Sequence, residues 1–166
     1  EQILIERQQS SSLLEAIGSE QFSKLGAGDA AEALSKVSGA SIARYQDRVR
    51  EHFDARRSVT SVEQRDGWER YVRGWWGYYG LSEDRRPITR WEGWTRRHIR
   101  KCFWQRWHSA EGRYRNLRKL GINPDLARVA RSGRGAWRIA RGLAMQSALS
   151  NRVLRKYRYF VPTDLG

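Results

Sequence analysis

The chain has 166 residues, enough for one domain or two small ones. No run approaches the roughly 20 apolar residues of a spanning helix, and no basic-then-apolar leader opens the chain, so we expect neither a membrane protein nor a secreted one. The single cysteine, Cys102, excludes an internal disulfide, and with three histidines it cannot complete a usual zinc-finger ligand set. These features predict a protein of the cytoplasm.

Charge is the strongest compositional feature. The chain has 32 Lys and Arg against 18 Asp and Glu, a formal charge of +14. Such a surface repels itself and favours a polyanionic partner. The chain also has 8 Trp, 7 Tyr and 4 Phe, too many aromatic residues for a basic tail that stays unfolded. We therefore expect a folded, basic module.

The charge is unevenly distributed along the chain. Residues 1–42 have 3 Lys and Arg against 6 Asp and Glu, with one aromatic residue, whereas residues 43–166 have 29 against 12 and all the other aromatics. The small residues Ser38–Ser41 favour a flexible boundary between two units. In the acidic part, apolar residues at loosely helical spacing predict short helices, the second capped by Asp29. We interpret this part as a helical appendage or a partner-docking hairpin.

The basic part is predicted to be helical throughout. A first helix over residues 42–57 places Val49 and Phe53 on one stripe, and a second helix follows Thr60 with Trp68 and further aromatics on one side. On its other side, two glycines each cost about 1 kcal/mol relative to Ala, which indicates close approach of a backbone or a ligand. No period-two strand of useful length competes with this pattern.

A third helix, predicted over residues 89–108 after a turn at 84–87, has two distinct faces. One arc is mainly apolar and includes Ile99 and Cys102. The opposite arc has like charges four residues apart, which destabilise a helix by a few tenths of a kcal/mol per pair. We expect an external anion to relieve this repulsion. The charged arc consists of Arg96, Arg97, Arg100 and Lys101, together with Trp104.

The rest of the sequence predicts short helices separated by residues that end a helix. A basic stretch over 113–119 ends at Leu120–Gly121, and Asn123–Asp125 begins a short helix that runs to residue 131. A glycine loop at 132–135 follows, and the last helix is predicted over 143–157.

The interleaving of basic and aromatic residues predicts nucleic-acid binding. Arginines and lysines would neutralise phosphates, and an accessible tryptophan would stack on unpaired bases. Trp75, Trp91 and Trp137 are expected in the core, whereas Trp104 is our candidate for stacking. The candidate nucleic-acid-binding residues are Arg73, Arg96, Arg97, Arg100, Lys101, Trp104, Arg106, Arg113, Arg115, Arg118, Lys119, Arg134 and Arg138.

Neither a catalytic centre nor a metal site is expected. His98 and Cys102 lie one turn apart, but a second ligand pair is lacking. The carboxylates are scattered among arginines, and there is neither a Walker loop nor a nucleophile elbow. The residues therefore predict no cofactor in this chain.

The segment Tyr71–Gly80 resembles the Arg-Gly-Trp-x-x-Tyr-aromatic signature in the maturase-specific region of group II intron reverse transcriptases. The basic residues 96–107 are similar to that family's arginine-rich helix, and 116–122 to its Leu-x-x-Leu-Gly turn. Further similarity in the same order extends the resemblance over about residues 43–157. Two departures are Gly77, where Asn is common, and the stretch 157–160, which lacks the usual Gly.

The resemblance implies an all-α protein: a thumb-like helical bundle with a second small basic helical module. The uneven charge separates an acidic helical segment (1–42), which matches nothing in the family, and the resemblance divides the rest into a thumb-like segment (43–88) and a basic maturase-like nucleic-acid-binding module (89–166). The resemblance further implies that the chain binds structured RNA or an RNA–DNA duplex, assisting intron RNA folding and splicing and gripping the template–primer.

Two alternatives concern parts outside this module. The Tyr-Ala-Asp-Asp metal motif of the polymerase palm does not occur in the sequence, so Mg²⁺ and polymerisation are implied only if a palm lies on another segment or chain. The chain would then be a portion or subunit of a reverse transcriptase-related enzyme, in a retroelement or a defence system. In the subunit alternative, residues 1–42 bind a protein partner.

Overall fold

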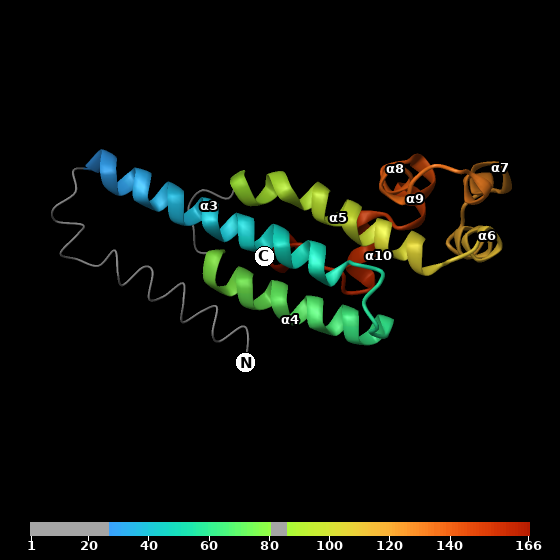
Figure 1. The fold of residues 1–166 in the computed structure, drawn as a ribbon, viewed down its shortest axis with the longest axis horizontal. Coiled ribbons are helices and arrows are strands. Elements are labelled where there is room, and N and C mark those ends of the chain that lie inside the picture. Colours follow the sequence, from blue (N-terminus) through green and yellow to red (C-terminus); the bar gives the residue numbers. More distant parts are fainter. Residues whose placement is uncertain (1–26, 81–85) are drawn as a thin grey trace. The chain divides into compact units, whose positions relative to one another are not determined.

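The computed structural model describes residues 27–80 and 86–166, and every regular element in these ranges is a helix, which confirms the predicted all-α fold. None of the described helices is both long and apolar enough to cross a bilayer. The elements are α3 (Ala27–His52), α4 (Ser61–Tyr79), α5 (Arg86–Arg106), α6 (Ala110–Lys119), α7 (Pro124–Ala127), η1 (Arg128–Arg131), α8 (Ala136–Ala140), α9 (Leu143–Ala148), α10 (Asn151–Lys156) and η2 (Pro162–Leu165). Helices α6 to α9 gather at the C-terminal end of α5 (Figure 1).

The chain divides into two compact units, Glu1–Asp47 and Arg48–Gly166. Helix α3 continues through Ser38–Ser41, where the small residues predicted a flexible boundary, and it begins before Asp29, the expected N-cap. A helix tolerates a glycine at a cost of about 1 kcal/mol, which good helix formers around it can offset. The apolar positions predicted to form a helix before residue 18 lie outside the described residues.

Aromatic side chains build the core of the unit Arg48–Gly166. The rings of Phe53 and Trp68 meet edge to face with their centroids 4.9 Å apart, and the Tyr159 ring lies 6.3 Å from Phe53. All three side chains are buried. The Trp68 indole N–H donates a hydrogen bond of 2.8 Å to the carbonyl of Phe160, which satisfies its only polar group. This contact ties α4 to the C-terminal segment.

Local signals set several helix ends as predicted. Thr60 and Glu63 form a capping box at the start of α4, with hydrogen bonds of 2.8 and 3.2 Å. Gly121, with φ of 87°, follows the end of α6 in the left-handed conformation that glycine favours. The Asn123 side chain caps α7, and Pro124 occupies its first turn. Helix α5, by contrast, already begins at Arg86, inside the predicted turn.

The last helix is not continuous, which corrects the prediction of one helix over residues 143–157. It is broken at Leu149, which has φ of −110° and ψ of 61°, into α9 and α10. The Ser150 hydroxyl then accepts a hydrogen bond from the backbone N–H of Val153 at 3.3 Å and starts α10. Leu149 and Leu154 are buried on either side of the break, which is why the apolar periodicity of the sequence continues across it.

The chain after α10 returns along α4 and α5. Buried Glu92 of α5 accepts a hydrogen bond of 2.9 Å from the backbone N–H of Thr163. Arg158 donates to Glu69 at 2.7 Å and to Asp66 at 3.1 Å, both on α4. Its φ of 65° is in the left-handed region, where glycine is unstrained. The ion pairs therefore hold a non-glycine residue in the left-handed conformation.

We predict that Arg158→Gly is more stable than Arg158→Ala by roughly 1 kcal/mol. Both variants lose the ion pairs to Asp66 and Glu69, but only glycine adopts the positive φ without strain. Urea unfolding of the two variants, compared at equal m-values, measures the difference. Equal stability of the two variants would show that the backbone at this position is relaxed.

Candidate nucleic-acid interface

Helix α5 contributes three arginines to one surface of the unit: Arg96, Arg97 and Arg100. At 100° per residue Arg97 lies about 160° from Ile99 and Arg100 about 160° from Cys102, and the side chains of Ile99 and Cys102 are buried as predicted. The arginine side is also covered in part, because α8 and the turn between α9 and α10 pack against α5. The three guanidiniums therefore have defined positions.

Arg100 is the anchor of this surface. Its guanidinium is buried and donates hydrogen bonds to the carbonyl of Leu149 at 2.8 Å and to the side-chain oxygen of Asn151 at 2.9 Å. Burial, with a smaller contribution from the charge of Arg96, lowers its pKa to about 10. The group therefore remains protonated at neutral pH, and its partners are oxygens without a formal charge.

The guanidinium of Arg97 lies over the aromatic ring of Trp137. The guanidinium carbon is 3.9 Å from the ring centroid, and Nε donates to the Trp137 carbonyl at 2.9 Å. Burial lowers the pKa of Arg97, and the charge of Arg141 lowers it further. These two cations repel each other, so an anion placed between them would be attracted by both.

Within residues 27–80 and 86–166, Arg96 is the one member of the trio that forms an ion pair with a carboxylate. Its nearest guanidinium nitrogen lies 3.8 Å from Asp164, which also pairs with Arg155 at 3.0 Å. One carboxylate therefore faces two arginines. The positive charge of the surface is reduced by this contact but not cancelled.

These side chains form one wall of a groove of about 770 Å³. The opposite wall comes from α8, α9 and the start of α10. Five arginines and no Asp or Glu line the groove, an arrangement suited to a polyanionic backbone. Its lining residues are Gly93, Trp94, Arg96, Arg97, Arg100, Ala140, Arg141, Gln146, Ser150, Asn151 and Arg152.

Arg141 and Arg152 are groove residues that the sequence analysis did not name as candidates. Both side chains are exposed, and within the described ranges neither forms a hydrogen bond or an ion pair. They lie 41 and 52 residues after Arg100 in the sequence. The spacing of Arg138 and Arg141, one turn apart, is the signal that could have drawn attention to the first of them.

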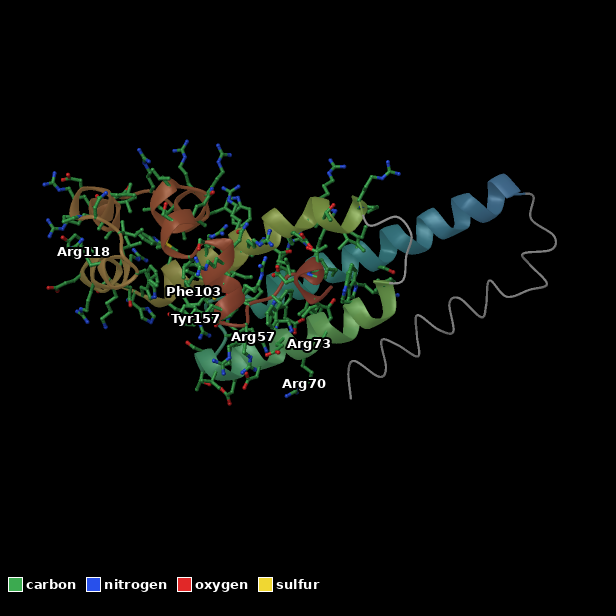
Figure 2. The ribbon with its side chains drawn as sticks, turned by 180° about the vertical axis from the view of Figure 1, so that it is seen from behind. Arg57, Arg70, Arg73, Phe103, Arg118 and Tyr157 are labelled. Atoms are coloured by element: carbon green, nitrogen blue, oxygen red, sulfur yellow. The ribbon has the colours of Figure 1, made fainter. Side chains whose placement is uncertain are left out.

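The other predicted binding residues fall into two groups. Arg115, Lys119, Arg134 and Arg138 are exposed, and no ion pair among the described residues engages them. Half-buried Lys101 likewise has none. The second group makes intramolecular contacts: Arg73 with Glu69, Arg106 with the Val59 carbonyl, Arg113 with the Trp104 carbonyl, and Arg118 with the Ile122 carbonyl. Figure 2 shows Arg118 on α6, apart from Arg70 and Arg73 on α4.

The prediction that Trp104 stacks on a base is wrong. The side chain is only 1% exposed and packs under the Arg113 guanidinium, which lies 4.8 Å above its ring. The helical wheel placed it among cations, but Arg113 of α6 covers its ring and donates to its carbonyl. Trp75, Trp91 and Trp137, expected in the core, are half-buried instead.

His98 packs against aromatic rings. Its ring lies between Trp94 and Trp137, at centroid distances of 4.3 and 4.5 Å, and buried Nδ1 has no hydrogen-bond partner in the described structure. No three His, Cys, Asp or Glu side chains gather as a metal site in residues 27–80 and 86–166. His98 is therefore a packing residue beside the groove.

The sequence of residues 42–121 matches the family model described as the group II intron, maturase-specific domain. Residues 42–121 belong to that family. No curated protein is similar enough in sequence to count as a match. The maturase-specific domain contains Arg96, Arg97 and Arg100, whereas Arg141 and Arg152, which complete the groove, follow the matched stretch.

We predict that acid destabilises the domain through His98. Burial, and then the charges of Lys101, Arg50 and Arg97, lower the pKa of this group from 6.5 to about 4. The folded state therefore holds neutral histidine, and the stability present above pH 6.5 is progressively lost as the pH falls to 4, by roughly 3 kcal/mol.

The measurement is urea unfolding of the wild type and of His98→Phe, which retains a ring between Trp94 and Trp137. The difference between their unfolding free energies should change over that pH range, because carboxylate titration is common to both proteins. A difference independent of pH would contradict the assignment.

Proposed function

We propose that the unit Arg48–Gly166 binds structured RNA along the arginine groove and thereby assists the folding of an intron RNA for splicing. The observation that carries the proposal is the groove itself: five arginines, three of them on α5, with no carboxylate in its lining. The maturase-specific domain at residues 42–121 favours intron RNA as the partner.

The contacts of the guanidiniums support binding to the phosphate backbone. Arg97 and Arg100 are held by an aromatic ring and by carbonyl oxygens, so little side-chain entropy is lost when a phosphate binds. Arginine also presents several donors to one phosphate. Backbone contacts position a nucleic acid without reading its sequence, so selectivity would come from the shape of the RNA.

An RNA–DNA duplex is the second proposed ligand, with the domain gripping the template–primer of a reverse transcriptase. The required Mg²⁺ ions would belong to a polymerase palm on another segment or chain, because the described residues offer no carboxylate cluster that could hold them. A protein that includes the palm should extend primers with a divalent metal, whereas this chain should not.

We also propose that residues 1–42 bind a protein partner, in a protein acting in the cytoplasm. Their net negative charge contrasts with the +17 of the rest of the chain. Deletion of residues 1–42 should abolish binding of that partner and leave RNA affinity intact. Unchanged assembly after the deletion would contradict the proposal.

The groove predicts a specific salt dependence of RNA binding. In Arg141→Gln and in Arg152→Gln, the slope of log affinity against log salt should flatten by about 0.7 for single-stranded RNA, because each variant loses one phosphate contact. Fluorescence anisotropy titrations at several salt concentrations measure this slope.

Arg56→Gln is the matched control. It removes the same charge from a side chain that is 91% exposed and pairs with Asp54, outside the groove lining. Its slope should equal that of the wild type. An RNA affinity independent of salt, or an equal effect in the control, would refute the groove as the binding site.

A further inference from the structure

A second concavity in the unit Arg48–Gly166 has a different chemistry from the arginine groove. It has a volume of about 370 Å³, near the lower end of the range of about 300–1,000 Å³ typical of small-molecule sites. We refer to it as the aromatic pocket. Its lining residues are Ser61, Val62, Arg65, Phe103, Trp107, Asn116, Lys119, Leu120, Leu149, Tyr157 and Tyr159.

Four aromatic rings contribute to this pocket. Phe103 lies edge to face with Trp107 at 6.3 Å and with Tyr159 at 5.2 Å, so these rings support one another. Tyr157 is 46% exposed, and Figure 2 shows it next to Phe103. An exposed ring beside a pre-formed aromatic cluster is the arrangement on which single-stranded nucleic acids stack their bases.

The charges of the pocket favour an anionic ligand. Arg65 and Lys119 are its charged lining residues, and no Asp or Glu lines it. Arg65 pairs with Asp66 at 3.2 Å, whereas Lys119 forms no ion pair within the described residues. The Asn116 side chain donates to the Gly112 carbonyl at 2.8 Å, which leaves its side-chain oxygen available as an acceptor. The pocket thus combines flat apolar walls with a cation and a polar group.

The aromatic pocket adjoins the arginine groove. Arg96 and Arg100 line the groove and Phe103 lines the pocket, and at 100° per residue these three positions fall on one stripe of α5. Trp107, which also lines the pocket, directly follows this helix. The two sites also meet at the break between α9 and α10, because Leu149 lines the pocket and the next two residues line the groove. Arg100 donates to the Leu149 carbonyl across this junction.

We propose that the aromatic pocket receives an unstacked nucleobase of the RNA whose phosphates occupy the arginine groove. The inference rests on the proposed RNA-binding function and adds a base-recognition site to it. Stacking against Tyr157 and its neighbours would supply affinity from any base, and the Asn116 oxygen could accept a hydrogen bond from an exocyclic amine. The ligand class is therefore RNA with an unpaired or bulged nucleotide.

The test compares a short single-stranded RNA with an abasic chain that has the same number of phosphates, at one salt concentration. The wild type should bind the RNA about 5- to 150-fold more tightly than the abasic chain, the range expected for one stacked base. In Tyr157→Ala and Tyr157→Leu this preference should decrease markedly, while affinity for the abasic chain stays unchanged. Tyr157→Phe should retain the preference because it keeps the ring.

Leu143→Ala is the matched control, since Leu143 is 70% exposed and lines neither site. Equal binding of RNA and abasic chain by the wild type would refute the pocket as a base-binding site, as expected if it instead receives a protein segment. That result would not affect the groove as the phosphate-binding site. A preference that survives in Tyr157→Ala and Tyr157→Leu would also overturn it. Binding of neither chain would refute the proposed RNA-binding function itself.

Discussion

The buried guanidinium of Arg100 holds the two candidate binding sites together. Its hydrogen bonds to Leu149 and Asn151 tie α5 to the junction of α9 and α10. In a continuous helix, the Leu149 carbonyl would accept from the backbone N–H of Val153. Here the Ser150 hydroxyl accepts from that N–H instead, which leaves the carbonyl available to Arg100. The break in the helix therefore makes the burial of this charge possible.

Burial of a cation is costly unless its donors are satisfied, and Arg100 is satisfied by oxygens that do not neutralise it. Arg97 follows the same principle, with an aromatic face and a carbonyl as partners. The fold thus fixes positive charge in place while leaving it available to a ligand. Asp164, shared between two arginines, is the one carboxylate among the described residues that pairs with the trio on α5.

The segment after α10 contributes side chains and backbone groups to the core of this unit. Tyr159 completes the aromatic core, Phe160 accepts from Trp68, and Thr163 binds buried Glu92. Tyr159 also lines the aromatic pocket. Both candidate sites therefore depend on residues that follow the matched stretch 42–121.

The sequence by itself determined the helical fold, the capped ends of α4 and α7, the apolar stripe of α5 and the family of residues 42–121, because these depend on local periodicity, capping and motif order. Only the tertiary structure decided which cations face a ligand. Trp104 is buried beneath Arg113 of α6, and Arg100 becomes an anchor because a carbonyl 49 residues away accepts from it. Arg141 and Arg152 join the groove through the same long-range packing. A helical wheel shows the direction of a side chain but not what lies opposite it.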